Sequence, residues 1–218
     1  MKSELAILAV IIVLVWYNVA SVDMGVDRKP YTEIVNSLEN LPEPVQIQTT
    51  GEKKTIINGE ETHITYLAEY TIVGRVVTTR NFENTLWNKR NSISPKDIGI
   101  VWGWLSNKEV DSKISWHTNP RASGWSVSDG IWLKSKGGIN AIGHNFSNNH
   151  LIPSDNNVNK LIKSIRNGDY VKIEGYLVNI NYGPNFRMTS RSSTSREDSW
   201  DGACETIYVT KVTWLKTR

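Results

Sequence analysis

A run without any charged side chain lies near the start of the sequence and constrains how the rest of the chain can fold. The run extends from Leu5 to Val22, and its first part, Leu5 to Val15, is wholly apolar. A helix of this length reaches roughly 27 Å, which is about the thickness of a bilayer core. Trp16 and Tyr17 lie toward one end, where such rings favour the lipid headgroup layer. We therefore expect residues 1–22 to form a transmembrane signal anchor.

Two other interpretations of this segment stay open. Val19-Ala20-Ser21 resembles a signal-peptide cleavage site, and the apolar core has the length of a signal-peptide core. A buried core helix is the third interpretation. The charges flanking the segment are nearly balanced, so they barely fix its orientation. Because short N-terminal spans usually export the remainder of the chain, we expect a single-pass membrane protein whose body is periplasmic or otherwise extracytoplasmic.

The composition allows one ordinary globular domain after the anchor. Of 218 residues, roughly 190 remain beyond the span, which is enough for a proper core. The net charge of +3 is too small to indicate nucleic-acid binding. Cys204 is the only cysteine, so no internal disulfide can form. The nine Trp and eight Tyr suit strand faces and stacking surfaces for carbohydrates or bases equally well.

Strand patterns dominate the part of the chain after the anchor. Residues 23–44 are interpreted as a linker with a short helix that starts near Pro30 and groups Ile34, Leu38 and Leu41 on one face. The domain itself spans 45–218. Asn58-Gly59 predicts a hairpin turn within it. Strands are expected at 45–48, 54–57, 63–78 with a bulge at Gly74, 98–105, 114–117, 130–133, 170–178 and 205–215, the last with a slip near Thr210.

One helix is expected late in the chain. Ser154 or Asp155 can cap it, Val158, Leu161, Ile162 and Ile165 share its apolar face, and Gly168 ends it. The passage from Arg166 to Tyr176 resembles the helix-to-strand passage of OB-fold domains, in which Gly175 would bend a strand around a barrel. The predicted fold is therefore mainly β: an OB-like small β-barrel with one short helix. A β-sandwich is the alternative.

Two polar clusters are candidates for a functional site. The first runs from Gly143 to His150 and is expected to be a loop; it contains His144, Asn149 and His150. The second lies between the last two strands, where a five-stranded barrel borders its binding face. Its candidates are Arg191 and Arg196, which could grip phosphate or carboxylate groups, with Asp198, Cys204 and Glu205. Both clusters can also be explained as loops tied by side-chain hydrogen bonds, and Cys204 as a buried inert thiol.

The motifs SNNHLIP (147–153), GDYVKIEGYL (168–177) and REDSWDGACE (196–205) together resemble a family of bacterial membrane-anchored proteins without an established activity. The resemblance covers roughly residues 70–212. The family's last motif has Gly where this chain has Trp200. The resemblance implies a bacterial envelope setting and no particular reaction, and it draws His144, His150, Arg196, Asp198, Cys204 and Glu205 together as one site.

The sequence favours a binding module over an enzyme. We expect a membrane-anchored envelope protein that binds a polar ligand or a partner protein through His144, Asn149, His150, Arg191, Arg196, Asp198 and Glu205. A structural subunit of an envelope complex is one alternative, and an enzyme that uses Cys204 with His150 is another. No zinc-type spacing is present, so no metal is expected. Periplasmic haem chaperones place Tyr four residues after their His, whereas Ser154 follows His150 at that distance, so no cofactor is expected either.

Overall fold

The computed structural model describes residues 26–57, 59–82, 93–119, 122–195 and 204–217. The predicted anchor, with Arg196 and Asp198, lies outside these ranges. Within them, no helix has the length and apolar character that crossing a bilayer requires. The described fold is mainly β, as the sequence predicts. Its strands are β1 (Thr32–Val35), β2 (Val45–Ile57), β3 (Glu60–Asn81), β4 (Lys96–Val101), β5 (Ser115–Asn119), β6 (Ala122–Ser126), β7 (Phe146–Pro153), β8 (Tyr170–Tyr182), β9 (Met188–Ser190) and β10 (Cys204–Thr217).

Short helices connect these strands. The α-helices are α2 (Gly130–Ser135), α3 (Ile139–Gly143) and α4 (Asn156–Ser164), and the 3-10 helices are η1 (Lys29–Tyr31), η3 (Trp104–Ser106), η4 (Lys108–Ser112) and η5 (Pro184–Phe186). The α4 helix forms as predicted, because the Asp155 side chain accepts a hydrogen bond from the Val158 N–H at 2.8 Å. Its apolar residues Val158, Leu161 and Ile162 are buried.

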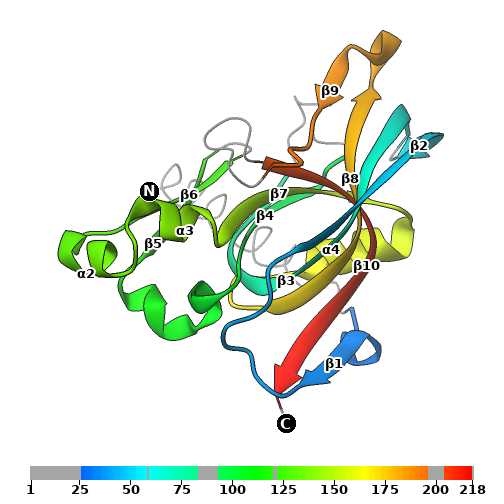
Figure 1. The fold of residues 1–218 in the computed structure, drawn as a ribbon. Coiled ribbons are helices and arrows are strands. Elements are labelled where there is room, and N and C mark those ends of the chain that lie inside the picture. Colours follow the sequence, from blue (N-terminus) through cyan, green and yellow to red (C-terminus); the bar gives the residue numbers. More distant parts are fainter. Residues whose placement is uncertain (1–25, 58, 83–92, 120–121, 196–203, 218) are drawn as a thin grey trace, which may run out of the picture.

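Five long strands pair in a closed circuit. β3 pairs with β4, β4 with β7, β7 with β10, β10 with β8, and β8 again with β3. Only the β7–β10 pairing in this circuit is parallel. Figure 1 shows these strands wrapped around one another, with α4 beside them and the β2–β3 and β8–β9 hairpins projecting from one end. The circuit encloses a core to which α4 contributes its apolar face.

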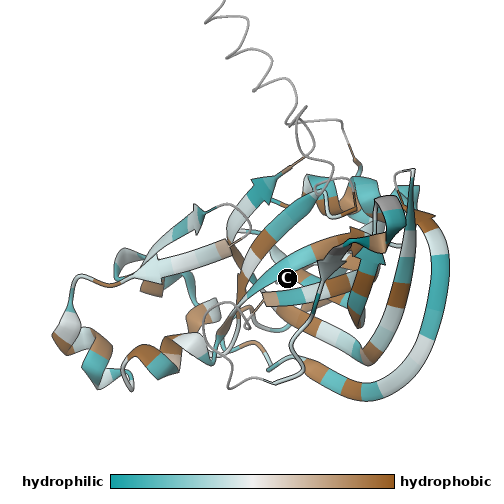
Figure 2. Ribbon diagram, turned by 90° about the horizontal axis from the view of Figure 1, so that it is seen from above, coloured by the Kyte–Doolittle hydropathy of each residue, from teal (hydrophilic) through white to brown (hydrophobic). Residues whose placement is uncertain are grey.

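A small lobe is inserted between β4 and β7. It contains β5, β6, α2 and α3, and it extends away from the strand circuit in Figures 1 and 2. Its buried residues pack with Val77 and Val101 of the strand circuit, and with Trp104, Trp116, Trp125 and Trp132, into an apolar cluster distinct from the circuit's core. Much of the tryptophan in the chain therefore serves packing in this lobe.

The structure corrects several local predictions. Residues 130–133 belong to helix α2 rather than to a strand, because Asp129 caps that helix by accepting a hydrogen bond from the Trp132 N–H at 2.9 Å. The polar stretch 143–150, expected to be a loop, is largely strand β7. In the linker, the helical turn at Pro30 is limited to η1, and Ile34 lies in β1, which pairs with β10. The β10 register shift between Val209 and Lys211 confirms the predicted slip near Thr210.

The predicted bulge at Gly74 does not form there. The ladder of β3 shifts instead between Tyr66 and Ala68 and between Val76 and Thr78. Gly74 serves a different purpose, since a side chain at this position would collide with the backbone of β4 at Val101.

Candidate functional site

Three chemically reactive side chains lie on three neighbouring strands of the circuit. Asp97 is on β4, His150 on β7 and Cys204 at the start of β10. Asp97 is directly opposite His150 across the β4–β7 pair, and His150 is opposite Thr206 across the β7–β10 pair. Because alternate residues of a strand face the same side, Cys204 shares its face with Thr206 and hence with His150 and Asp97.

The Asp97 carboxylate holds one side of the His150 ring. The distance from His150 Nδ1 to Asp97 Oδ1 is 2.9 Å, although the ring N–H does not point straight at that oxygen. The two side chains are 15% and 2% exposed, so water screens their attraction poorly. Asp97 also accepts a 3.4 Å hydrogen bond from the Ser94 hydroxyl. The carboxylate therefore holds the ring at its Nδ1 side, and His150 also interacts with the side chain of Cys204.

The surroundings of His150 favour the imidazolium form. Burial alone would lower the pKa of His150, but its close polar and charge interactions with Asp97 and Cys204 outweigh it and raise the pKa to about 9. The imidazole is therefore protonated at neutral pH.

Cys204 is half-buried and carries a free thiol. The side-chain amide of Asn148, its neighbour on β7, places Nδ2 3.4 Å from the sulfur. The cysteine is thus surrounded by a histidine with an acidic partner and by a polar amide. Such an arrangement can activate a sulfur nucleophile and move a proton to a leaving group.

Only some of the other predicted site residues lie near this centre. His144 is exposed at the C-terminal end of α3, before β7 begins, so it lies apart from His150. Asn149 is fully buried and donates to the Ile98 carbonyl at 3.3 Å, on the opposite face of β7 from His150. Glu205 accepts a 2.7 Å hydrogen bond from the Ser192 hydroxyl. The side chain of Arg191 is exposed, but its carbonyl accepts a 3.2 Å hydrogen bond from Thr206, which places its backbone beside the centre.

Sequence reasoning missed Asp97 and Asn148. An aspartate at the start of a strand usually faces solvent, and nothing in the sequence shows that this one is buried against His150. Asn148 belongs to the first polar cluster, but only the β7–β10 register places it beside the thiol. The run Asn148-Asn149-His150 carries a signal, since three consecutive polar residues are unusual within a strand.

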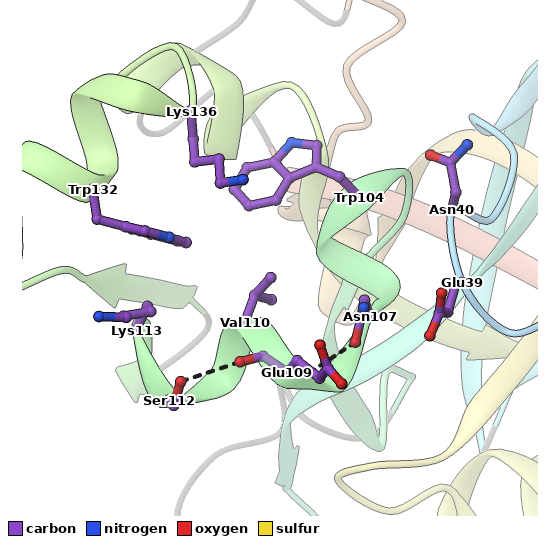
Figure 3. Close-up of a pocket in the computed structure, with 10 residues that line it drawn as sticks. All are labelled: Glu39, Asn40, Trp104, Asn107, Glu109, Val110, Ser112, Lys113, Trp132 and Lys136. Atoms are coloured by element: carbon purple, nitrogen blue, oxygen red, sulfur yellow. Dashed lines mark hydrogen bonds between the residues drawn. The ribbon is translucent and has the colours of Figure 1, made fainter.

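A pocket of about 490 Å³ lies elsewhere, at the opposite end of β4 from Asp97. Figure 3 shows Trp104 and Trp132 on one side of it, with Lys136 beside them. The two indole rings meet edge to face at 6.0 Å, and the Lys136 ammonium lies 5.9 Å from the Trp104 ring centre. The remaining lining residues are Glu39, Asn40, Asn107, Glu109, Val110, Ser112 and Lys113. This pocket is separate from the cysteine centre.

Comparison of the chain with protein-family profiles, curated proteins and solved structures gives no match. Within the described ranges, no three or more His, Cys, Asp or Glu side chains are placed to hold a metal ion.

Proposed function

We propose that the protein is an enzyme with a cysteine nucleophile, in which Cys204 attacks the substrate, His150 transfers protons and Asp97 positions the histidine. The observation that carries the proposal is the row of Asp97, His150 and Cys204 on three adjacent strands, with the histidine 2.9 Å from its carboxylate. The reaction types open to such a centre are acyl transfer and thiol exchange.

Each residue has a definite task in this proposal. The Cys204 sulfur attacks the substrate, and the imidazolium of His150 then donates its proton to the leaving group. Asp97 keeps the ring oriented and stabilises its positive charge, because it is buried where water cannot do so. Loss of Asp97 would leave the ring with the wrong orientation and a lower affinity for its proton.

Alkylation of the folded protein by iodoacetamide tests the proposal. Cys204 in the native full chain at pH 7 should react faster than a thiol in an unfolded peptide, because the polar groups of His150 and Asn148 lie beside its sulfur. His150→Gln should slow this reaction about tenfold or more, whereas His144→Gln, which changes an exposed histidine outside the centre, should leave the rate unchanged. Modification of Cys204 only after denaturation would disprove the proposal.

We further propose that the strand circuit is an OB-type barrel held at the outer side of a bacterial membrane by residues 1–22. The closed pairing, the parallel β7–β10 pair and the position of α4 between β7 and β8 support the barrel. The uncharged run Leu5–Val22, which is wholly apolar from Leu5 to Val15, supports the anchor. A C-terminal alkaline phosphatase fusion, which is active only outside the cytoplasm, should be active; an inactive fusion would contradict this placement.

Binding of a polar ligand is a second candidate function, and the pocket at Trp104 and Trp132 favours it. Indole faces with carboxylates, amides and ammonium groups around them suit a sugar, whose apolar face stacks on a ring while its hydroxyls form hydrogen bonds. Chitotriose should then change the tryptophan fluorescence of the native chain but not that of Trp132→Ala. Unchanged fluorescence of the native protein would exclude chito-oligosaccharides as its ligands.

Stoichiometric co-purification of another envelope protein would instead favour a structural subunit.

A further inference from the structure

The side-chain amide of Asn148 lies beside the Cys204 sulfur. It lies opposite Cys204 across the parallel β7–β10 pair, and its Nδ2 is 3.4 Å from Sγ. The side chain is only 4% exposed, so it cannot turn freely into water. Because Nδ2 donates to the sulfur, the amide presents its N–H groups to Cys204 and its oxygen away from it.

The amide of Asn148 is not satisfied by its surroundings. Among the described residues, its Oδ1 is buried without a hydrogen-bond partner. The next residue is a contrast within the same strand, because Asn149 donates to the carbonyls of Ile98 and Ser147 at 3.3 and 3.1 Å. Buried amides are normally bonded on both sides, and an exception calls for a reason other than stability. Asn149 therefore stabilises the pairing of β7 with β4, whereas Asn148 is positioned by β7 beside the Cys204 sulfur.

We propose that Asn148 donates its Nδ2–H to the oxygen of a substrate carbonyl, and that the substrates of this site are acyl compounds, namely esters, thioesters or amides, rather than disulfides. The inference rests on the proposed cysteine enzyme and adds the class of substrate. A donor fixed next to the nucleophile is useful where negative charge develops on an oxygen during attack. Attack on a disulfide develops no such oxygen, so a fixed amide would contribute little there.

The reaction balances with water as the second substrate. The Cys204 sulfur forms a bond to the carbonyl carbon, and the carbonyl electron pair moves to the oxygen that Asn148 faces. When that pair returns, the bond to the leaving group breaks, and the leaving group takes the proton of His150. Water then attacks the thioester, gives a proton to His150, and releases the acid and the thiolate. The net change is hydrolysis of the acyl compound.

Two small reagents separate this role from simple activation of the thiol. Acylation by p-nitrophenyl acetate passes through an oxyanion, whereas alkylation by iodoacetamide does not. In the full chain in detergent, Asn148→Ala should slow acylation about 100-fold, while the alkylation rate stays within about threefold. Asn148→Gln, which keeps the amide, should recover part of the acylation rate, and it serves as a second variant if the alanine protein does not fold.

The outcomes are distinguishable. An equal fall in both rates would mean that Asn148 only stabilises the thiolate, and unchanged rates would mean that it has no part in the chemistry; either result overturns the acyl-substrate inference but leaves the nucleophile intact. If native Cys204 in the unaltered protein reacts with neither reagent, the proposed cysteine enzyme itself fails.

Discussion

The ionisation of one residue, His150, links the site to the stability of the fold. Its pKa rises from the usual 6.5 to about 9 on folding, because Asp97 and Cys204 favour the charged ring more than burial disfavours it. The folded protein therefore binds a proton that the unfolded chain releases above pH 6.5. A group of this kind stabilises the folded state fully below pH 6.5, and its contribution is lost as the pH rises toward 9.

We predict that the stability of the native protein falls between pH 6.5 and 9 by up to ~3 kcal/mol more than that of His150→Gln. Urea denaturation across this range measures the difference. Asp97→Asn removes the main attractive charge and should move the pH-dependent fall to lower pH. Parallel stability curves for the native protein and His150→Gln would show that the ring carries no extra proton in the folded state.

At the scale of elements, periodicity predicts the strands well where one face is apolar. The strands predicted at 170–178 and 205–215 both form, as parts of Tyr170–Tyr182 and Cys204–Thr217, and the slip near Thr210 is present. Strand β7 has the sequence pattern of a loop because Asn148, Asn149 and His150 interrupt the apolar alternation. The polar residues of the candidate site therefore make strand β7 hard to recognise from the sequence. The pairing of His150 with Asp97 depends on the register between β4 and β7, which no local pattern encodes.

Close contact between strands β8 and β10 depends on Gly175. A β-carbon at this position would collide with the backbone carbonyl of Tyr208, where β10 crosses β8. We expect Gly175→Ala to lower the free energy of unfolding by about 1–3 kcal/mol, since the strands must move apart to admit the methyl group. Gly143→Ala is the matched control, because a β-carbon there has no neighbour within 4 Å. Equal unfolding midpoints in urea for the two variants would contradict the close packing.

For the whole molecule, the position of Cys204 relative to the start of the described chain limits which substrates can reach it. Cys204 begins β10, while β1, which comes after the predicted anchor in sequence, pairs with the other end of β10 at Trp214. Figure 1 shows β1 and the C-terminus together at the end of the molecule away from β9. Ten residues of strand separate Cys204 from Trp214, a path of roughly 30 Å along β10. If residues 1–22 lie in a bilayer, the chain enters the domain at the end of β10 that lies farther from Cys204.

This arrangement predicts that Cys204 acts on water-soluble substrates and that the membrane does not shield it. The full chain in phosphatidylcholine vesicles and a soluble variant that begins at residue 26 should be alkylated by iodoacetamide at rates within about threefold of each other, since the reagent reaches the thiol through water in both. Cys204→Ser in vesicles controls for reaction at other groups, because Cys204 is the only cysteine. A vesicle rate many times slower than the soluble rate would mean that the centre faces the lipid, and lipid-borne acyl compounds would then become its expected substrates.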